Sequence, residues 1–185
     1  LLRYEKMQQA YNEFWIIRRR MDYIFDLIEE ISKRWQSISE IADFIIASLI
    51  MLTRANGSAL RILKWDKLEM VASFGLWPEW SGKKHIPLKA SLAYNGFLKG
   101  ENVKIFDISL SSEYSTKTLA LKNNFSSAFV MPLAFRWVFL WSISLYIYSQ
   151  KDFHIFENTF LPRYKQVIEV ALGTLLDTKK LTEIQ

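Results

Sequence analysis

The loop that begins at Ser73 contains residues whose side chains could bind a flat ligand. It reads Ser73-Phe74-Gly75-Leu76-Trp77-Pro78-Glu79-Trp80, and it holds more aromatic rings than a solvated connection needs. The faces of Phe74 and Trp77 could stack on a planar ring, an arrangement that contributes about 0.5–1.5 kcal/mol beyond the buried area. The alternative is that both rings fill the core beneath a covering segment.

A second candidate is the start of a short helix, which the pattern predicts over Ser91–Lys99 and which Gly100 ends. The first amides of a helix have no partner within it, so the N–H groups of residues 91–93 could bind an anion. Further donors could come from Tyr114-Ser115-Thr116. A ring at the aromatic loop and a phosphate at these amides would together describe a nucleotide.

Other chemistries find little support in the residue types. The chain has no cysteine, which excludes disulfides, thiolate metal sites and cysteine nucleophiles. His85 and His154 lie far apart and lack the spacing of a metal site, so we expect no metal, and His85 as a haem ligand is the weaker alternative. Serine-based catalysis would need a nucleophile elbow and a histidine relay, which the sequence lacks. We therefore expect no catalytic residue.

The composition indicates one domain with long appendages. Of the 185 residues 50% are hydrophobic and 15% aromatic, enough for a sizeable core. The net charge of +5 comes from scattered basic pairs without interleaved aromatic residues, which argues against nucleic acid. The apolar runs are shorter than the roughly 20 residues of a membrane span. Because cysteine is absent and no signal peptide is visible, we expect a cytoplasmic segment of a longer protein, without a membrane contact.

Two rows of apolar residues repeat every seven positions through the N-terminal third. One row runs from Met7 to Leu49 and the other from Ala10 to Leu52, three residues later. This is the a/d pattern of a coiled coil, whereas a single helix packed on its own domain needs no such strict repeat. We therefore predict a parallel homodimer through the N- and C-terminal helices. The expected residues of the shared seam are Phe14, Met21, Ile24 and Ile28.

The rest of the chain alternates between strand-like and helical patterns. Ser37-Ile38-Ser39-Glu40 has the form of a capping box, so we predict a helix over 38–55. The polar segment 109–124 is expected to be irregular. The other predicted elements are strands at 58–65, 68–74, 85–88, 103–108, 127–135 and 138–149, and a closing helix at 158–183. Antiparallel pairs with helices grouped at the ends indicate an α+β fold.

A series of short motifs follows these elements in order. They are Ala59–Trp65 with Asp66, Ala72-Ser73-Phe74-Gly75, Ile86-Pro87-Leu88 before Ser91-Leu92-Ala93, Gly100-Glu101-Asn102-Val103 with Ile105-Phe106-Asp107, Val130-Met131-Pro132-Leu133, and Phe153 with Glu157. Together they resemble a GAF domain over residues 37–176. The resemblance implies a PAS-like antiparallel sheet of five to six strands with helices on one face and long signalling helices at both ends. Residues 1–36 would then be a coiled-coil linker, and 177–185 the start of a C-terminal linker.

Domains of this kind sense small molecules and rarely catalyse. The resemblance implies a pocket on one sheet face, covered by the short helix and by segment 109–124, with a cyclic nucleotide as ligand, cAMP favoured over cGMP, and no required cofactor. The residues expected to bind it are Ser58, Ser73, Phe74, Trp77, Ser91, Leu92, Ala93, Asp107, Tyr114 and Thr116. By analogy, the output domain expected beyond Gln185 is a diguanylate cyclase. A ligand-free dimerisation module and a haem-based sensor stay open as alternatives.

Overall fold

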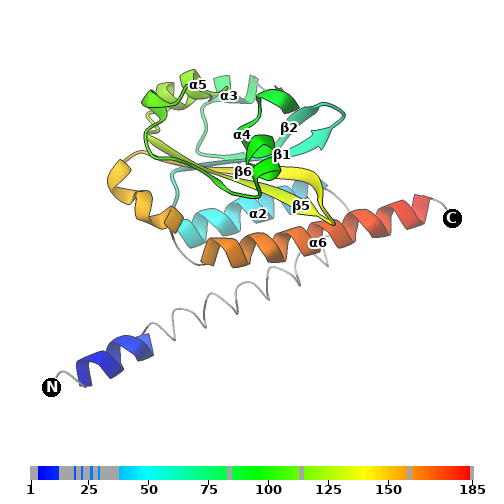
Figure 1. Cartoon of the computed structure of the whole chain (residues 1–185). Coiled ribbons are helices and arrows are strands. Elements are labelled where there is room, and N and C mark those ends of the chain that lie inside the picture. The colour runs from blue at the N-terminus through cyan, green and yellow to red at the C-terminus, as the bar shows by residue number, and fades with distance from the viewer. Residues whose placement is uncertain are drawn as a thin grey trace.

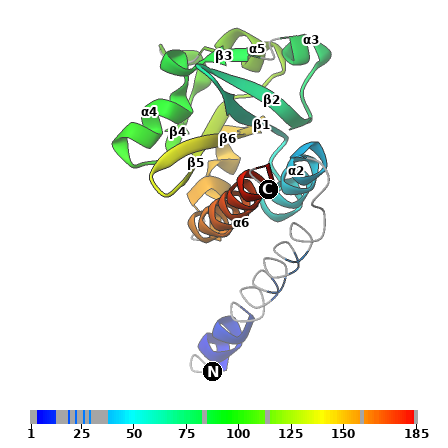
Figure 2. The same ribbon diagram turned by 90° about the vertical axis from the view of Figure 1, so that its right-hand side faces the viewer.

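The computed structural model describes residues 4–12, 19, 22, 26, 29, 38–82, 85–112, 115–157 and 160–183. At its centre is a six-stranded sheet with the strand order β3-β2-β1-β6-β5-β4, in which every neighbouring pair is antiparallel. Two long helices cover one face of the sheet and several short helices cover the other (Figures 1 and 2). The predicted α+β class and the strand number are thus confirmed.

Two hairpins supply the four central strands. β1 (Gly57–Lys64) and β2 (Lys67–Phe74) form the first, and β5 (Ser127–Phe135) and β6 (Val138–Ile147) form the second. The turn of the second hairpin is Arg136-Trp137, and both residues have positive φ, as in the two-residue turns that match the twist of paired strands. The short strands β3 (His85–Pro87) and β4 (Val103–Ile105) form the two edges.

The helical face carries the main hydrophobic core. α2 (Ile38–Thr53) and α6 (Phe160–Glu183) run side by side across it (Figure 2). Successive side chains of a strand point to opposite faces, so alternate residues of the central strands meet these helices. The apolar side chains that β6 contributes to this core are Trp141, Ile143, Leu145 and Ile147. A turn of 3-10 helix, η3 (Gln150–Glu157), connects β6 to α6.

The opposite face is covered by short elements and by two smaller hydrophobic clusters. The helices are α3 (Pro78–Gly82), α4 (Leu92–Lys99) and α5 (Lys117–Lys122), with the 3-10 turns η1 (Leu88–Ala90) and η2 (Ile108–Leu110). One cluster centres on Trp80, Phe125 and Tyr146, and the other on Leu68 and Phe139. Helices were expected on one face, and the long ones are confined to one. The short helices lie on the other face, where residues next to α4 and α5 cover the pocket described below.

Three local predictions differ from the structure. Residues 78–82 of the expected loop form α3, which directs Trp80 into the core, where it is fully buried. The strand expected over 103–108 ends at Ile105, and part of the segment expected to be irregular forms α5. The seam residues Phe14, Met21, Ile24 and Ile28 lie outside the described residues, although residues 4–12 are helical. None of the helices that the structure describes is long and apolar enough to cross a lipid bilayer.

Candidate functional site

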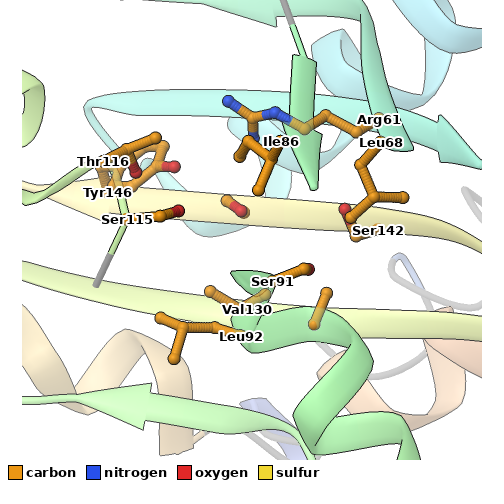
Figure 3. A pocket seen from close by; sticks show the side chains of 12 residues that line it. Arg61, Leu68, Ile86, Ser91, Leu92, Ser115, Thr116, Val130, Ser142 and Tyr146 are labelled. Carbon is orange, nitrogen blue, oxygen red and sulfur yellow. The ribbon is translucent and has the colours of Figure 1, made fainter. Parts of the chain in front are cut away.

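A small pocket, called the Arg61 pocket below, lies on the sheet face opposite α2 and α6. Side chains from five strands form its floor and walls, and residues at the start of α4 and just before α5 complete it (Figure 3). The space that it offers to the centres of water molecules is about 20 Å³, which is room for about one ordered water. Its lining residues are Arg61, Leu68, Ile86, Ser91, Leu92, Ala93, Ser115, Thr116, Val130, Ser142, Ser144 and Tyr146.

The polar part of the pocket is produced by strand alternation. In β6 the residues Ser142, Ser144 and Tyr146 line the pocket, while the residues between them pack against α2 and α6. In β1, Arg61 stands between Leu60 and Ile62, which both belong to the helical core. The sheet register places Arg61 opposite Ser142, so the two side chains share a face.

Arg61 is the charged residue of this pocket. Its side chain is almost fully buried, with 2% of the residue exposed. Its Nε and Nη2 atoms have no hydrogen-bond partner among the described residues, and none of the ion pairs formed by those residues includes Arg61. Figure 3 shows the guanidinium extending along the sheet toward the side of the pocket where Thr116 and Tyr146 lie. Nearly all buried polar groups in native proteins are hydrogen-bonded, so this one needs a reason.

The N-terminus of α4 forms another wall. Ser91 is its N-cap, with extended backbone angles and a side-chain Oγ that accepts a hydrogen bond from the Tyr94 N–H at 3.3 Å. This bond satisfies one of the first amides of the helix, while those of Leu92 and Ala93 have no partner within the helix. The helix ends at Gly100, whose left-handed backbone conformation closes it as the sequence predicts.

The hydroxyl groups around the pocket belong to buried residues. Thr116, Ser142 and Ser91 are 3%, 2% and 4% exposed. Ser58, one of the predicted ligand contacts, is fully buried on the neighbouring strand and donates its hydroxyl hydrogen to the Ser144 carbonyl at 2.9 Å. Ser58 therefore supports the strand that carries Ser144 and does not itself line the pocket.

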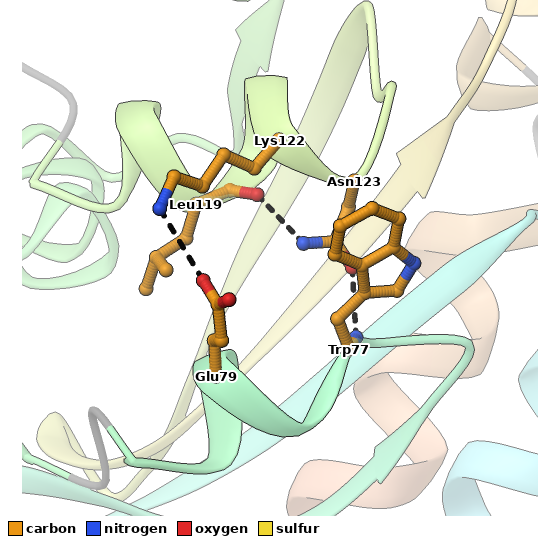
Figure 4. Close-up of polar contacts among 5 residues, drawn as sticks. All are labelled: Trp77, Glu79, Leu119, Lys122 and Asn123. Carbon is orange, nitrogen blue, oxygen red and sulfur yellow. Dashed lines mark hydrogen bonds and ion pairs between the residues drawn. The ribbon is translucent and has the colours of Figure 1, made fainter.

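The aromatic loop lies elsewhere on the molecule. Phe74 and Trp77 are about half exposed, Ser73 is exposed, and none of the three lines the pocket. The Trp77 N–H donates to Oδ1 of Asn123 at 2.7 Å, and Nδ2 of Asn123 donates to the Leu119 carbonyl at 2.7 Å (Figure 4). These bonds fasten the loop to the end of α5.

An ion pair reinforces that junction between α3 and α5. Nζ of Lys122 lies 3.3 Å from a carboxylate oxygen of Glu79 (Figure 4). Both side chains are more than half exposed, so the pair adds little stability. The rings of Phe74 and Trp77 do not line the Arg61 pocket, and the Trp77 backbone is bonded at the junction with α5.

Asp107 caps a turn. Its Oδ1 accepts hydrogen bonds from the Ser109 N–H at 2.9 Å and from the Ser109 hydroxyl at 2.6 Å. The hydroxyl bond is the main reason why the pKa of Asp107 lies below its ordinary value. The side chain starts η2 and does not line the pocket. Tyr114, another predicted contact, lies outside the described residues.

The structure thus brings together four of the predicted residues, namely Ser91, Leu92, Ala93 and Thr116. The sequence analysis missed Arg61, Ser142 and Ser144. The available signals were the polar residues at every second position of β6 and the single arginine inside the apolar run 59–63 of β1. The part of the chain that the structure describes contains no group of three histidine, aspartate or glutamate side chains that could hold a metal ion.

Comparison with known proteins identifies the architecture. No protein-family model matches the sequence, and no curated protein matches it. The GAF domain of a phosphoenolpyruvate-protein phosphotransferase from Acinetobacter superposes with a TM-score of 0.67 at 15% identity, over 88% of this chain and 98% of that chain. The chain has the GAF fold.

Two further GAF-fold neighbours come from different kinds of protein. The GAF domain of a two-component sensor histidine kinase from Bacillus halodurans gives a TM-score of 0.59 at 15% identity, over 77% of this chain and 98% of that chain. A free methionine-R-sulfoxide reductase from Neisseria meningitidis, solved in complex with its substrate, gives 0.66 at 11% identity, over 86% and 91%. Because one fold serves such different proteins, the function of this domain depends on the residues of its own pocket.

Proposed function

We propose that this GAF domain is a regulatory sensor without catalytic activity, which binds a small molecule in the Arg61 pocket and reports the binding through α2 and α6. One observation carries the proposal. A small pocket with unpaired guanidinium nitrogens lies on one face of a sheet whose other face packs against α2 and α6. β1 and β6 contribute to both, so a change of strand position on binding reaches the helices directly.

The contacts between the helices and the sheet support this route. The Tyr164 hydroxyl on α6 lies 2.7 Å from Oγ of Ser48 on α2, and it donates to the Ile45 carbonyl at 3.2 Å. On the sheet side, the Ala134 N–H of β5 donates to Oε1 of Glu169 on α6 at 2.9 Å. α2 and α6 are therefore hydrogen-bonded to each other, and α6 is also hydrogen-bonded to the sheet.

The chemistry of a sensor also fits the residue types. The reductase among the structural neighbours acts on free methionine sulfoxide, whereas this chain has no cysteine to serve as a redox-active thiol. GAF domains of a sensor kinase and of a phosphotransferase are the neighbours whose context favours regulation.

A cyclic nucleotide, cAMP before cGMP, is the specific ligand that we propose to test first. Its phosphate could bind at Ser91–Ala93. The pocket has room for about one water, so the covering segment would have to move before the base could reach Phe74. Segment 109–124 is the expected mover. We further propose a cytoplasmic homodimer joined through the N-terminal helix that precedes α2 and through the C-terminal helix, with a diguanylate cyclase as the output domain.

Thermal unfolding with cAMP or cGMP at millimolar concentration tests the ligand. A ligand at 100 times its Kd stabilises the folded state by about 2.7 kcal/mol, so a bound nucleotide raises the Tm visibly. Phe74→Ala should weaken binding at least tenfold, about 1.4 kcal/mol. Trp65→Ala is the control, because Trp65 is an exposed aromatic ring at the far end of the same hairpin.

Hydrogen exchange tests the reporting. Protection should increase across 109–124 on binding and, to a smaller degree, near residues 172–181 of α6. Unchanged exchange in α6 with a saturating ligand would contradict the proposed route. No thermal shift and no heat of binding with either nucleotide would reject the cyclic nucleotide, and a concentration-independent monomer in sedimentation would reject the dimer.

A ligand-free dimerisation module is the second candidate, and the small volume of the pocket favours it. A pocket filled by Phe97, Phe125 and Trp141 would support this alternative. Phe125 is buried on the pocket face and Phe97 packs against Phe139 with 5.5 Å between ring centres, but Trp141 belongs to the opposite core. A dimer that responds to no small molecule would support this candidate.

A further inference from the structure

The guanidinium of Arg61 is the least explained group among the described residues. An arginine side chain carries its positive charge at any physiological pH and presents a planar fork of N–H donors. Buried charges in proteins are normally paired, because taking an unpaired charge out of water is very unfavourable. Arg61 is 2% exposed, and two of its nitrogens have no partner in the described part of the chain.

The described residues around Arg61 supply hydroxyl groups and no carboxylate. No aspartate or glutamate is among the described residues that line the pocket. The polar neighbours are the hydroxyls of Ser91, Thr116, Ser142 and Ser144, each on a residue that is 5% exposed or less. Such groups can bind the oxygens of a ligand, but they cannot neutralise a cation. Within the described part of the chain, the positive charge of Arg61 is therefore unmatched.

The start of α4 adds a second feature of the same sign. The unpaired first amides of a helix and its dipole both favour an anion. Leu92 and Ala93, the first two residues of α4, line the same pocket as the guanidinium. Figure 3 shows Leu92 at this wall. A ligand oxygen in this cavity would meet N–H donors from a helix on one side and from Arg61 on the other.

We propose that the Arg61 pocket binds a small oxyanion, a carboxylate or phosphate group that Arg61 holds through two parallel N–H···O bonds. Bidentate pairs of this kind are the preferred way in which arginine recognises both groups. Room for about one water in the pocket favours an anion with few atoms beyond the charged group. This inference rests on the proposed function and narrows its ligand to a chemical class.

Arg61→Met separates a binding role from a structural one. Methionine fills a similar volume without the charge. If the role of Arg61 is to bind an anion, the ligand-free variant should have a higher Tm than the parent chain, because a buried unpaired charge is removed. If Arg61 is instead a structural residue, the same change should lower the Tm, and that result would overturn the proposal.

The binding experiment uses the whole 185-residue chain in a zwitterionic buffer of constant ionic strength. The probes are formate, acetate and inorganic phosphate, with formamide and acetamide as uncharged analogues of the two carboxylates. We expect a saturable rise of the Tm with at least one oxyanion and none with the amides. Comparison of formate and acetate with phosphate tells which of the two groups the pocket prefers.

Two variants show whether the response belongs to this site. Arg61→Met should abolish the shift, and Arg61→Lys should weaken binding at least tenfold because lysine keeps the charge but lacks the fork. Lys64→Met is the matched control: it removes a cation from the exposed end of the same strand, where Lys64 pairs with Glu69 at 2.9 Å. The response of this control should equal that of the parent.

The outcomes for the inference and for the proposed function are distinct. A shift that survives in Arg61→Met, or no shift with any oxyanion, overturns the inference. A shift with the amides alone also overturns it, yet leaves a sensor with an uncharged ligand. If an oxyanion binds through Arg61 but hydrogen exchange in α6 does not change, the anion site stands and the reporting function fails.

Discussion

The two faces of the central sheet differ in how completely their polar groups are satisfied. On the face covered by α2 and α6, the core is apolar and its internal hydroxyls, Ser48 and Tyr164, are bonded to each other. On the pocket face lie all three buried side-chain atoms without a partner that the described residues contain, namely Nε and Nη2 of Arg61 and Nε1 of Trp80. The polar groups of the helical face are hydrogen-bonded, as a stable core requires. The pocket face has hydrogen-bond donors without a partner among the described residues, as the proposed binding site requires.

The largest effect should come from Leu145→Ala in β6. Its comparison is Ser144→Ala, because the neighbouring Ser144 points to the opposite face of the sheet. Leu145→Ala removes a fully buried side chain from the helical core and should lower the free energy of unfolding by about 2–5 kcal/mol. Ser144→Ala, on the pocket face, should cost less than about 1 kcal/mol. Urea unfolding of the two variants measures the contrast. Equal losses would show that both faces carry the fold alike.

Gly173→Ala tests how closely α6 approaches the sheet. A Cβ at residue 173 would lie 2.0 Å from Cγ of the Phe135 ring, so the ring or the helix must move. Overpacking of this kind costs about 1–3 kcal/mol, and the better helix propensity of alanine returns about 1 kcal/mol at most. We expect a net loss in thermal unfolding. In a chain that already carries Phe135→Ala, Gly173→Ala should cost much less, because the ring that the new Cβ would meet is absent. An equal loss of stability in that chain would contradict the explanation.

Tyr164→Phe tests the polar bond between the two terminal helices. It deletes the hydroxyl that bonds to Ser48 and Ile45, and it should lower the free energy of unfolding by about 0.5–1.5 kcal/mol. Tyr148→Phe is the control, because that side chain is half exposed. In a double-mutant cycle, Ser48→Ala should add less to Tyr164→Phe than it removes from the parent. Simple additivity would show that the hydroxyls do not act as a pair.

Glu169→Gln should give the smallest effect, a change in the pH dependence of stability. Burial raises the pKa of Glu169 above its ordinary value of 4.5, although the Ala134 N–H and Lys165 oppose the shift. A raised pKa means that the folded state holds the proton more firmly, so this group favours folding below pH 4.5 and loses that contribution as the pH rises through the folded-state pKa.

The glutamine variant keeps an acceptor for the Ala134 N–H but has no proton to lose. Its unfolding free energy should therefore fall less than that of the parent as the pH rises just above 4.5. Chemical unfolding at a series of pH values measures the difference. Parallel curves for parent and variant would mean that burial of Glu169 has no influence on its titration.

The sequence predicted the elements that carry their own local signals. The helix predicted over 91–99 is α4, which ends at Gly100 as expected, and the strands predicted at 127–135 and 138–149 meet at the turn Arg136-Trp137. These features depend on backbone chemistry within a few residues. The seven-residue rows stay a prediction, because the seam residues lie outside the described part of the chain.

The candidate site was predicted only in part because its other half depends on pairing between distant strands. An arginine within an apolar strand gives no sign of what lies opposite, and Ser142 meets Arg61 only through the β1–β6 register. The aromatic loop misled for a similar reason. Gly75 has a φ of 66°, and the chain then enters α3, which buries Trp80 and leaves Phe74 and Trp77 half exposed. Which ring turns inward is set by the chain path and not by the residue types.

The alternation of β6 has a consequence for redesign of this domain. Pocket residues and core residues alternate along β6, and each set lies on its own face of the sheet. Residues 142 and 144 can therefore be varied without altering the packing against α2 and α6. A deletion of one residue within β6 would instead exchange the two sets, placing serines in the core and Trp141, Ile143 and Leu145 in the pocket. A variant library should therefore substitute at positions 61, 142 and 144 and keep the length of this strand fixed.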